Sequence, residues 1–510
     1  MHIIGARGCR FGTDINDNAS RSDREGGGIE RARGSREADP HRPAYHARPP
    51  VHWMNDPNGL IHYKGKYYLF YQHNPYGAQW GDIHWGHMSS ADLVHWEHLP
   101  IALAPSEGYD RDGCFSGSAV EHEGRLHLFY TGNLFTTPVG VPDDLLQQQC
   151  VAVSEDGIHF EKSARNPIIP APPPEVGQNT HFRDPKVWKH GKRWHMVVGV
   201  RMNDTGKVVM YRSPDLIDWE FAGVIAESDG TMGYMHECPD FFSLGGKDVL
   251  LLSPEGASAV GGERTSGYYV GQLDYESVRY EHGPFQRLDY GFDFYAPQTL
   301  TDPCGRRILI GWMPMDGAGL GKQWAGCMTI PRELTLQSDT NRLLIRPAAE
   351  MKLLRSAPRS AGPFAVRDRE FHTIPGIAGE CVELLVEYDL AATDATEFGM
   401  HVRASADGAE KTVIAYHAQT GQVVFERTDA GEGVAGMKAC AIASGGSPDI
   451  LTLHLFLDRS TLELFINDGE YVMSGYIFPA AASRGIEFFA AGGTAAVRRV
   501  QCWDMESAVE

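Results

Sequence analysis

A unit of about 60 residues recurs five times between residues 37 and 354, and this repeat restricts the possible folds more than any other feature. In each copy a glycine beside charged residues precedes a short apolar run, as in KGKYYLFYQ. The glycines that mark the copies are Gly65, Gly124, Gly191, Gly246 and Gly305. A second series of aromatic–Glu pairs, from Trp96-Glu97 to Tyr280-Glu281, repeats in step. Because one small sheet cannot bury both of its faces alone, such repeats favour a five-bladed β-propeller.

The chain changes character after the expected propeller at 37–354. The stretch APRSAGPF is rich in Pro, Ser and Gly, so 355–370 is expected to be a linker. Beyond it, alternating apolar runs such as LTLHLFLD predict short strands, and 371–510 is expected to be a β-sandwich. Residues 1–36 lack apolar periodicity and are expected to form a disordered leader. The predicted fold class is all-β, a five-bladed β-propeller followed by a C-terminal β-sandwich.

Composition and charge exclude several classes of function. The net charge is −20 and no Lys/Arg cluster occurs, so nucleic acid is not an expected partner. No stretch approaches about 18 consecutive apolar residues and no classical secretion signal is found, so we expect no membrane partner and a cytoplasmic location. The nine cysteines are scattered without a CxxC pair, which predicts free thiols and no metal site. Oligomeric state is not indicated.

Three acidic residues lie at matching places before the repeat glycines. Asp56, Asp184 and Glu237 precede their glycines by nine, seven and nine residues, and Ser116 and Tyr295 hold the equivalent places in the other copies. If the strand that carries them is the innermost of each blade, ring closure brings all five side chains into one channel. Taken alone, the residues around Asp56 fit a tight turn equally well, and the Arg-Asp pair of FRDP fits an ordinary ion pair. Three acids at matching places favour a common site.

These motifs resemble those of glycoside hydrolase family 32, the invertase and fructanase family. WMNDPNG at 53–59 is similar to the family's nucleophile motif, FRDP at 182–185 to its stabiliser motif and HECPD at 236–240 to its acid/base motif. The likeness covers roughly residues 40–510 and is strongest to the intracellular bacterial branch that hydrolyses sucrose 6-phosphate. The leader does not match. The family's fold is a five-bladed propeller with a β-sandwich, in agreement with the repeats.

The resemblance implies retaining hydrolysis of the β-fructofuranosidic bond of sucrose 6-phosphate, sucrose or both, which releases fructose and glucose or its 6-phosphate. It implies Asp56 as nucleophile, Glu237 as general acid/base and Asp184 as stabiliser of the transition state, with no metal and no cofactor. Since the acid must be protonated, we expect Asp56 and Asp184 to raise the pKa of Glu237. Family positions around the sugar are matched by Trp53, Asn55, Gln72, Trp80, Phe115, Ser116, Arg183, Tyr295 and Trp312.

Other functions remain open from the sequence. A fructan hydrolase or fructosyltransferase of the same family would share the site, and a related furanosidase acting on arabinan would often invert. An inactive sugar-binding propeller, from a different class, has no reason to keep all three acids. A phosphate on the substrate would need cationic donors at the channel mouth. Arg111, Arg201 and Lys322 lie in predicted blade loops and are candidates.

Overall fold

The chain is described by a computed structural model, and the residues that it describes are 39–137, 144–258, 264–317, 320–442 and 449–508. The leader expected at 1–36 lies outside them. Residues His41–Glu510 form one compact unit. Its regular structure is almost entirely β-strand, which confirms the predicted all-β class. No helix in the described part of the chain is long and apolar enough to cross a membrane.

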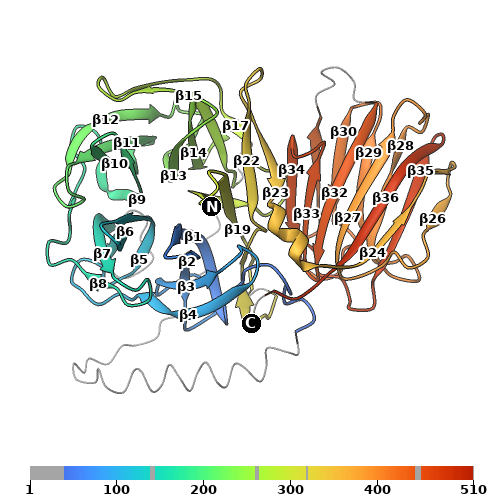
Figure 1. Cartoon of the computed structure of the whole chain (residues 1–510), viewed down its shortest axis with the longest axis horizontal. Coiled ribbons are helices and arrows are strands. Elements are labelled where there is room, and N and C mark those ends of the chain that lie inside the picture. The colour runs from blue at the N-terminus through green and yellow to red at the C-terminus, as the bar shows by residue number, and fades with distance from the viewer. Residues whose placement is uncertain (1–38, 138–143, 259–263, 318–319, 443–448, 509–510) are drawn as a thin grey trace. The chain divides into compact units, whose positions relative to one another are not determined.

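Five sheets make up the first part of this unit, one for each copy of the repeat (Figure 1). Blade 1 contains β1 (His52–Tyr63), β2 (Lys66–Asn74), β3 (His84–Ser90), β4 (Trp96–Leu103) and β20 (Trp324–Ala325). Blade 2 contains β5 (Cys114–His122), β6 (Arg125–Phe135), β7 (Leu145–Ser154) and β8 (Glu161–Lys162). Blade 3 contains β9 (Gln178–His190), β10 (Arg193–Met202), β11 (Thr205–Ser213) and β12 (Glu220–Glu227).

The remaining two blades have the same plan with short additions. Blade 4 contains β13 (Met235–Leu244), β14 (Lys247–Glu255), β15 (Gly267–Asp274), β16 (Arg279–His282) and β17 (Gln286–Arg287). Blade 5 contains β18 (Tyr295–Thr301), β19 (Arg307–Met313), β21 (Cys327–Met328), β22 (Arg332–Gln337) and β23 (Arg342–Pro347).

The first strands of the five blades meet around a common centre. β1 contacts β5, β5 contacts β9, β9 contacts β13, β13 contacts β18, and β18 contacts β1, so the ring closes. The short β20, which follows β19 in the chain, pairs in parallel with β1 and ties the last blade to the first. Each blade thereby buries its faces against its neighbours. The predicted propeller is present.

Both repeats in the sequence mark turns at fixed places in a blade. The turn between the first and second strands contains a glycine with φ between 58° and 81°, a conformation that glycine adopts without steric strain; these are Gly65, Gly124, Gly191, Gly246 and Gly305. The second series follows the third strand. There Asp92, Asp156, Asp215 and Asp274 each accept backbone N–H groups two and three residues later.

An irregularity in each first strand positions the side chains at the centre. The pairing register with the second strand shifts at residues 55–56, 116, 184–185, 238–239 and 296–297. A bulge of this kind bends a strand and changes the direction of its side chains. Proline is present in or beside four of the five shifts, and most of these strands are sheet edges, where its missing N–H is tolerated. The site residues are therefore placed by bulges in strands.

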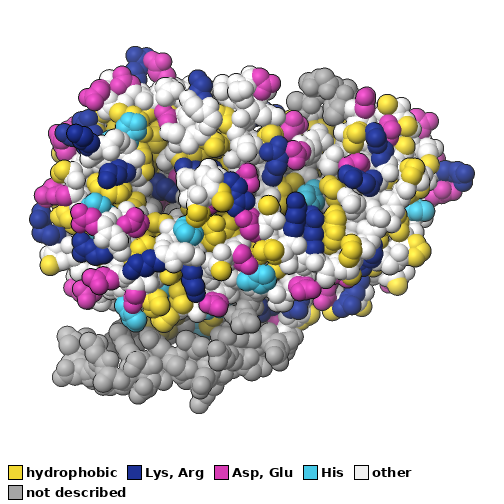
Figure 2. Space-filling model, in the orientation of Figure 1, with side chains coloured by type: hydrophobic (Ala, Val, Ile, Leu, Met, Phe, Trp, Pro, Cys, Tyr) yellow, Lys and Arg dark blue, Asp and Glu magenta, His cyan; other side chains and the backbone are white. Residues whose placement is uncertain are grey.

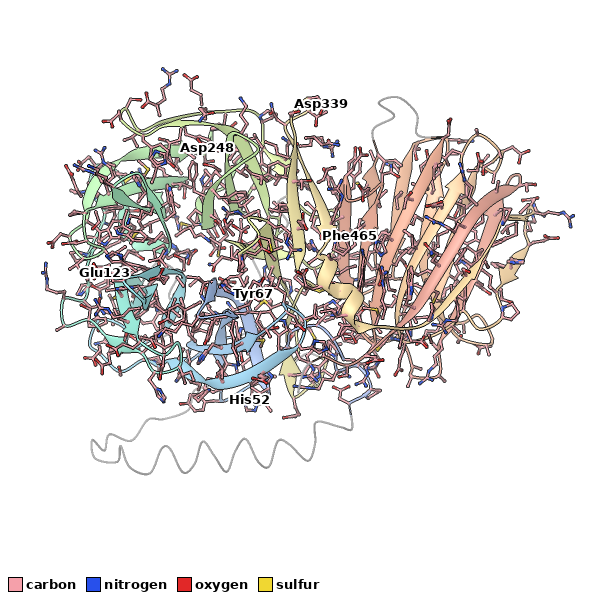
Figure 3. All side chains as sticks on the ribbon, in the orientation of Figure 1. His52, Tyr67, Glu123, Asp248, Asp339 and Phe465 are labelled. Atoms are coloured by element: carbon pink, nitrogen blue, oxygen red, sulfur yellow. The ribbon has the colours of Figure 1, made fainter. Side chains whose placement is uncertain are left out.

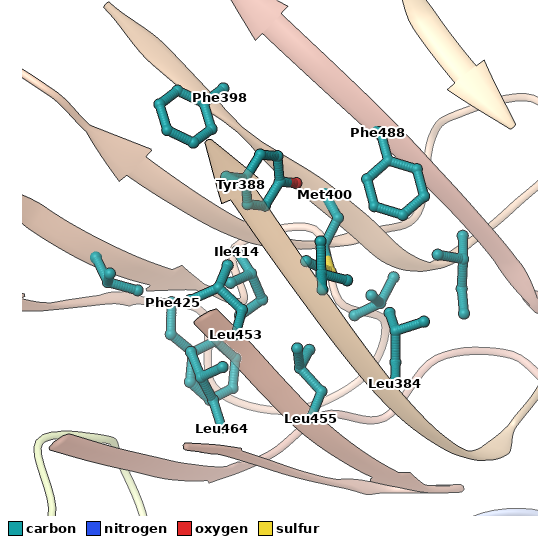
Figure 4. Close-up of a cluster of buried hydrophobic side chains, with 14 of the residues drawn as sticks. Leu384, Tyr388, Phe398, Met400, Ile414, Phe425, Leu453, Leu455, Leu464 and Phe488 are labelled. Carbon is teal, nitrogen blue, oxygen red and sulfur yellow. The ribbon is translucent and has the colours of Figure 1, made fainter. Parts of the chain in front are cut away.

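Two sheets form the sandwich that follows the propeller. The first contains β24 (Arg355–Ala361), β25 (Phe364–Val366), β27 (Cys381–Asp389), β32 (Ile450–Asp458), β33 (Thr461–Ile466), β34 (Tyr471–Tyr476) and β36 (Ala495–Met505). The second contains β26 (Phe371–Thr373), β28 (Glu397–Ala404), β29 (Thr412–His417), β30 (Gln422–Glu426), β31 (Met437–Ala441) and β35 (Gly485–Ala491). Alternate apolar residues such as Leu384, Met400, Phe425, Leu455 and Phe488 fill the space between them (Figure 4). The predicted sandwich is confirmed.

The segment expected as a linker differs from the prediction. A 3-10 helix at Ala349–Leu354 ends the propeller, and β24 and β25 then pair with β36 of the sandwich. β24 is an edge strand, and its register shifts around Pro358. Edge strands and bulges accept proline because no ladder bond needs its missing N–H. Most of 355–366 is therefore sheet, although its composition is that of a loop.

Propeller and sandwich are joined by an apolar core and a buried network of charges. Phe465 of β33, labelled in Figure 3, belongs to a cluster that includes Leu309 and Leu334 of blade 5. In the same contact Arg332 donates hydrogen bonds to Glu463, at 3.1 Å from Nε, and to Asp289, at 3.2 Å. Because these charges are buried, loss of one partner would leave an uncompensated charge and destabilise the fold.

The segment before β1 enters this network through His46. Its Nδ1 lies 2.8 Å from Asp458 Oδ2, and its Nε2 lies 2.9 Å from Glu463 Oε1. Asp458 also accepts the backbone N–H groups of Ala44, Tyr45 and His46. Residues 44–46, which are expected from the sequence to belong to the propeller, therefore bind strands of the sandwich.

Candidate active site

A cavity of about 620 Å³ lies where the first strands meet, and all five blades contribute to its wall. Asp56, Phe115, Asp184, Glu237 and Tyr295 represent blades 1 to 5. Every predicted site residue lines this cavity except Ser116, which donates a hydrogen bond to Asp56. The closed ring thus brings together acids that are far apart in the chain.

Asp56 is held by neutral donors. Ser116 Oγ donates to Oδ2 at 2.5 Å, and Asn55 Nδ2 donates to Oδ1 at 3.3 Å. Gln72 in turn donates to Ser116 and accepts a bond from Asn55 at 2.7 Å. Burial, followed by the charge of Glu237, raises the pKa of Asp56, and the Ser116 bond opposes this rise. Both oxygens are therefore oriented, but no cation neutralises the carboxylate through these bonds.

Glu237 is held by an arginine and a tyrosine. Arg183 donates to Oε1 from Nη2 at 2.8 Å and from Nε at 3.2 Å, and the Tyr295 hydroxyl donates to Oε2 at 2.6 Å. Burial raises the pKa of Glu237, but the Arg183 charge and these bonds outweigh it and leave the pKa below its ordinary value. The expectation that neighbouring acids raise this pKa is wrong for this geometry, because two guanidinium N–H groups favour the ionised carboxylate.

Asp184 is close enough to both other acids for their charges to affect its pKa. Its Oδ2 accepts the backbone N–H of Cys238 at 2.8 Å, and its own backbone N–H donates to Thr131 Oγ1 at 3.0 Å. Its φ of 68° belongs to the left-handed region, in keeping with the bulge in β9. Burial raises the pKa of Asp184 to about 7; Arg183 opposes the rise, while the charges of Glu237 and Asp56 add to it. A substrate that donates hydrogen bonds would favour the ionised form.

Aromatic side chains form another part of the wall. The rings of Trp53 and Trp312 meet edge to face at 5.8 Å, and those of Trp80 and Phe115 at 5.9 Å. Trp53 also donates to Asn55 at 2.6 Å, which connects this wall to the polar one. Apolar faces beside a few fixed polar groups are typical of a small-molecule site and suit a sugar, which has both C–H faces and hydroxyls.

Several residues of the cavity were not predicted. His181 lies 2.9 Å from Arg183 Nη1, and strand alternation, which places residues i and i+2 on one face, could have indicated it. Glu255, the last residue of β14, lies 3.5 Å from Arg183 Nη2 and accepts a bond from Tyr234. Arg264 also lines the cavity. No local sequence signal marks Glu255 or Arg264.

The remaining sequence predictions concern the candidate phosphate-binding cations, metal ligands and cysteines. Arg111, Arg201 and Lys322, the candidates for a phosphate contact, do not line the cavity. Among the residues that the structure describes, no group of three or more His, Cys, Asp or Glu could hold a metal ion. Each cysteine in this part of the chain is a free thiol.

Comparison with known proteins identifies the family. The glycosyl hydrolases family 32 N-terminal domain matches residues 46–347, and the family 32 C-terminal domain matches residues 350–504. A sucrose-6-phosphate hydrolase of Escherichia coli is 40% identical over 471 residues, which cover 91% of this chain and 94% of that protein. A raffinose invertase of Escherichia coli is 39% identical, with 90% and 94% covered.

Solved structures agree with these relatives. A GH32 beta-fructofuranosidase of Bombyx mori is 35% identical and superposes with a TM-score of 0.81, covering 97% of this chain and 100% of that one. A sucrose-6-phosphate hydrolase from Lactobacillus gasseri is 26% identical, with a TM-score of 0.82 and coverage of 96% and 98%. The chain therefore belongs to glycosyl hydrolase family 32 and is a glycoside hydrolase.

Proposed function

We propose that this chain is a retaining β-fructofuranosidase that hydrolyses sucrose, sucrose 6-phosphate or both. The observation that carries the proposal is the pair Asp56 and Glu237, which line one cavity but have different partners. A retaining glycosidase needs one carboxylate to attack and a second to exchange a proton. The names of the relatives support the choice of sugar.

Asp56 acts as the nucleophile in this proposal. Its carboxylate attacks the anomeric carbon of the fructosyl group as the bond to the glucosyl oxygen breaks, and a fructosyl–Asp56 ester forms. Ser116 and Asn55 hold the two oxygens in place for this attack. Water then attacks the same carbon, fructose leaves with its configuration retained, and Asp56 is regenerated.

Glu237 gives a proton to the departing glucosyl oxygen and later takes one from the attacking water. Its lowered pKa means that the free enzyme holds it mainly ionised, so the proton must be gained when substrate binds. A sugar in the cavity displaces water and strengthens the burial effect that already raises this pKa. The descending limb of the pH profile is therefore expected at higher pH for kcat than for kcat/KM.

Asp184 stabilises the transition state through fructose hydroxyls in this proposal. These hydroxyls would donate to its carboxylate, and Arg183 at 3.9 Å helps to keep it charged. As positive charge develops on the sugar ring, ionised Asp184 and Asp56 both become more favourable neighbours. The aromatic wall formed by Trp53 and Trp312 would face the C–H side of the ring.

The proposal is tested with Glu237→Gln and, as the matched variant, Glu255→Gln at another glutamate that contacts Arg183. Glu237→Gln should lower kcat on sucrose by about 10²–10⁴-fold, the usual size of general acid catalysis. The loss should be smaller on a fructoside with an activated leaving group, which departs without a proton. Glu255→Gln should show no such dependence on the leaving group. Equal losses of Glu237→Gln on both substrates would contradict the acid role.

The stereochemistry and the location complete the proposal. The first fructose released should be the β-anomer, as observed by NMR during the first turnovers; the α-anomer would indicate inversion. We also place the enzyme in the cytoplasm, because a phosphorylated sugar such as the relatives' substrate does not cross an apolar membrane unaided. Activity confined to the periplasm or medium after cell fractionation would exclude that location.

A further inference from the structure

Arg264 differs from the other arginine of the cavity wall in having no anionic partner among the residues that the structure describes. Its guanidinium lies over the Trp312 ring, 5.8 Å from the centroid, and it lines the cavity while remaining exposed. Within the described ranges no hydrogen bond or ion pair reaches it. The cavity wall therefore carries a guanidinium with five N–H donors, which makes a cation–π contact with Trp312.

Arg183, by contrast, is fully occupied. It forms ion pairs with Glu237 at 2.8 Å, Glu255 at 3.5 Å and Asp184 at 3.9 Å, and its side chain is only 10% exposed. Its positive charge is offset by three carboxylates. A further anion in the cavity would find no unused charge there.

The three cations suggested by the sequence have partners of their own, although Arg201 contacts two residues of the cavity wall, His181 at 3.3 Å and the ring of Tyr234 at 4.9 Å. Arg111 pairs with Asp112 at 3.1 Å, and Arg201 bonds to Asp204 at 3.2 Å and to a backbone carbonyl. Lys322 contacts His41 at 2.8 Å. Since none of the three lines the cavity, Arg264 is the cation best placed to meet a charged group on the substrate.

A phosphate dianion needs such a donor in this protein. The chain carries a net charge of −20, and on the face shown in Figure 2 side chains of both signs are interspersed without a broad basic surface. Inside the cavity, Glu237 and Glu255 would repel a phosphate. Arg264 lies within electrostatic reach of Glu237, because its charge contributes to lowering the pKa of that acid. Arg264 and Glu237 therefore line the same cavity within electrostatic reach of each other.

We propose that Arg264 binds the 6-phosphate of the leaving glucosyl group and so determines the preference for sucrose 6-phosphate over sucrose. The inference rests on the proposed β-fructofuranosidase function. Guanidinium and phosphate are matched in shape, since two parallel N–H groups can bind two phosphate oxygens. The contact with the Trp312 ring, which also lines the cavity, holds the guanidinium at the cavity wall.

The test compares kcat/KM for sucrose 6-phosphate and sucrose in the full-length enzyme and in Arg264→Met, Arg264→Lys and Arg111→Ala. Arg264→Met keeps the apolar stem and should lower the ratio of the two values by about 10- to 150-fold, the range expected for a charge-assisted contact. Arg264→Lys keeps the charge without the fork and should lower the ratio less. Arg111→Ala, an exposed arginine outside the cavity, should leave the ratio unchanged. The wild-type preference should also weaken with added salt.

A second measurement does not depend on turnover. Titration calorimetry should show tighter binding of glucose 6-phosphate than of glucose to the wild type, and Arg264→Met should abolish the difference. If the wild type splits sucrose but the ratio is near one, or is the same in Arg264→Met, the inference is overturned while the proposed function stands. If neither sugar is split, the proposed function fails, and the calorimetric comparison still decides whether Arg264 recognises the phosphate.

Discussion

Two buried clusters of charge in this protein differ in how their carboxylates are supplied with donors. In the cavity, Asp184 and Glu237 share Arg183 with Glu255, and Asp56 is held by neutral donors. Asp56 and Asp184 have a raised pKa, and Glu237 has a lowered one. In the contact between blade 5 and the sandwich, Asp458 and Glu463 are supplied by Arg332, His46 and backbone N–H groups. Burial by itself raises the pKa of both acids. His46 outweighs this effect at Asp458, and Arg332 outweighs it at Glu463, so the pKa of each acid is lowered.

The difference separates a site for chemistry from a site for stability. Carboxylates with a raised pKa are short of donors, and a ligand that supplies hydroxyl donors can satisfy them. Carboxylates with a lowered pKa already have their donors from the protein, so removing one partner exposes a buried charge. Substitutions in the first cluster should therefore affect activity more than stability, and those in the second should do the opposite.

The largest expected effect is at Asp56. Asp56→Asn should lower kcat on sucrose by about 10⁴-fold or more, because the ester to the fructosyl group cannot form. The fold should be retained, since burial makes the charge of Asp56 unfavourable rather than stabilising. Circular dichroism and fructose release from the same preparation check this. A folded Asp56→Asn protein that keeps more than about a tenth of wild-type activity would sink the assignment.

The reverse result is expected at Glu463. Glu463→Gln should reduce the free energy of unfolding by about 3–5 kcal/mol, because Arg332 and His46 lose their shared carboxylate in a buried place. The kcat of the protein that remains folded should not change. Urea titration and active-site-normalised kinetics measure the two quantities. If Glu463→Gln lowers kcat and leaves the free energy of unfolding unchanged, this cluster does not serve stability rather than activity.

A smaller effect concerns pH and His46. Burial lowers its pKa, but the bonds to Asp458 and Glu463 prevail and raise it from 6.5 to about 9. The folded state thus holds its proton more tightly than the unfolded chain, so this stabilisation is complete below pH 6.5 and is lost as the pH rises through about 9. The loss should be about 2–3 kcal/mol between these limits.

The variant His46→Gln tests this dependence. Its unfolding free energy, measured by urea titration at several pH values, should change less over that window than the wild type's. If the unfolding free energy changes equally with pH in the two proteins, a group other than His46 is responsible. Since His46 is remote from the cavity, kcat serves as the control and should follow the same pH profile in both.

The smallest expected effect is a gain in stability at Asp184. Its pKa is raised from 3.8 to about 7, so the folded state favours the protonated form, and the destabilisation grows as the pH rises from 3.8 through about 7. Asp184→Asn should therefore raise the unfolding free energy by about 1 kcal/mol at pH 8 and by less at pH 5, while activity falls. Thermal unfolding at the two pH values gives the comparison. If Asp184→Asn is less stable than the wild type at pH 8, Asp184 stabilises the fold as Asp458 and Glu463 do.

Much of the fold could be predicted from the sequence because it depends on turns and strands formed by residues close together in the chain. Each blade turn requires a backbone conformation that glycine adopts freely, so the repeat of Gly65 and its equivalents determined where the hairpins lie. Alternation of apolar residues determined the sandwich strands. The three acids could be found because they stand at one position of a repeated unit, and a ring must bring equivalent positions together. These features depend on residues close in sequence.

Other features depend on residues that are distant in sequence and close only in the folded protein. The pKa of Glu237 is set by Arg183 and Tyr295, which reach it from other blades, so its direction could not follow from the acids alone. The strand at 355–361 pairs with β36, more than a hundred residues later, and this pairing outweighs a loop-like composition. Arg264 carries no motif; only the closed ring, which places its guanidinium over Trp312, puts it beside the substrate cavity.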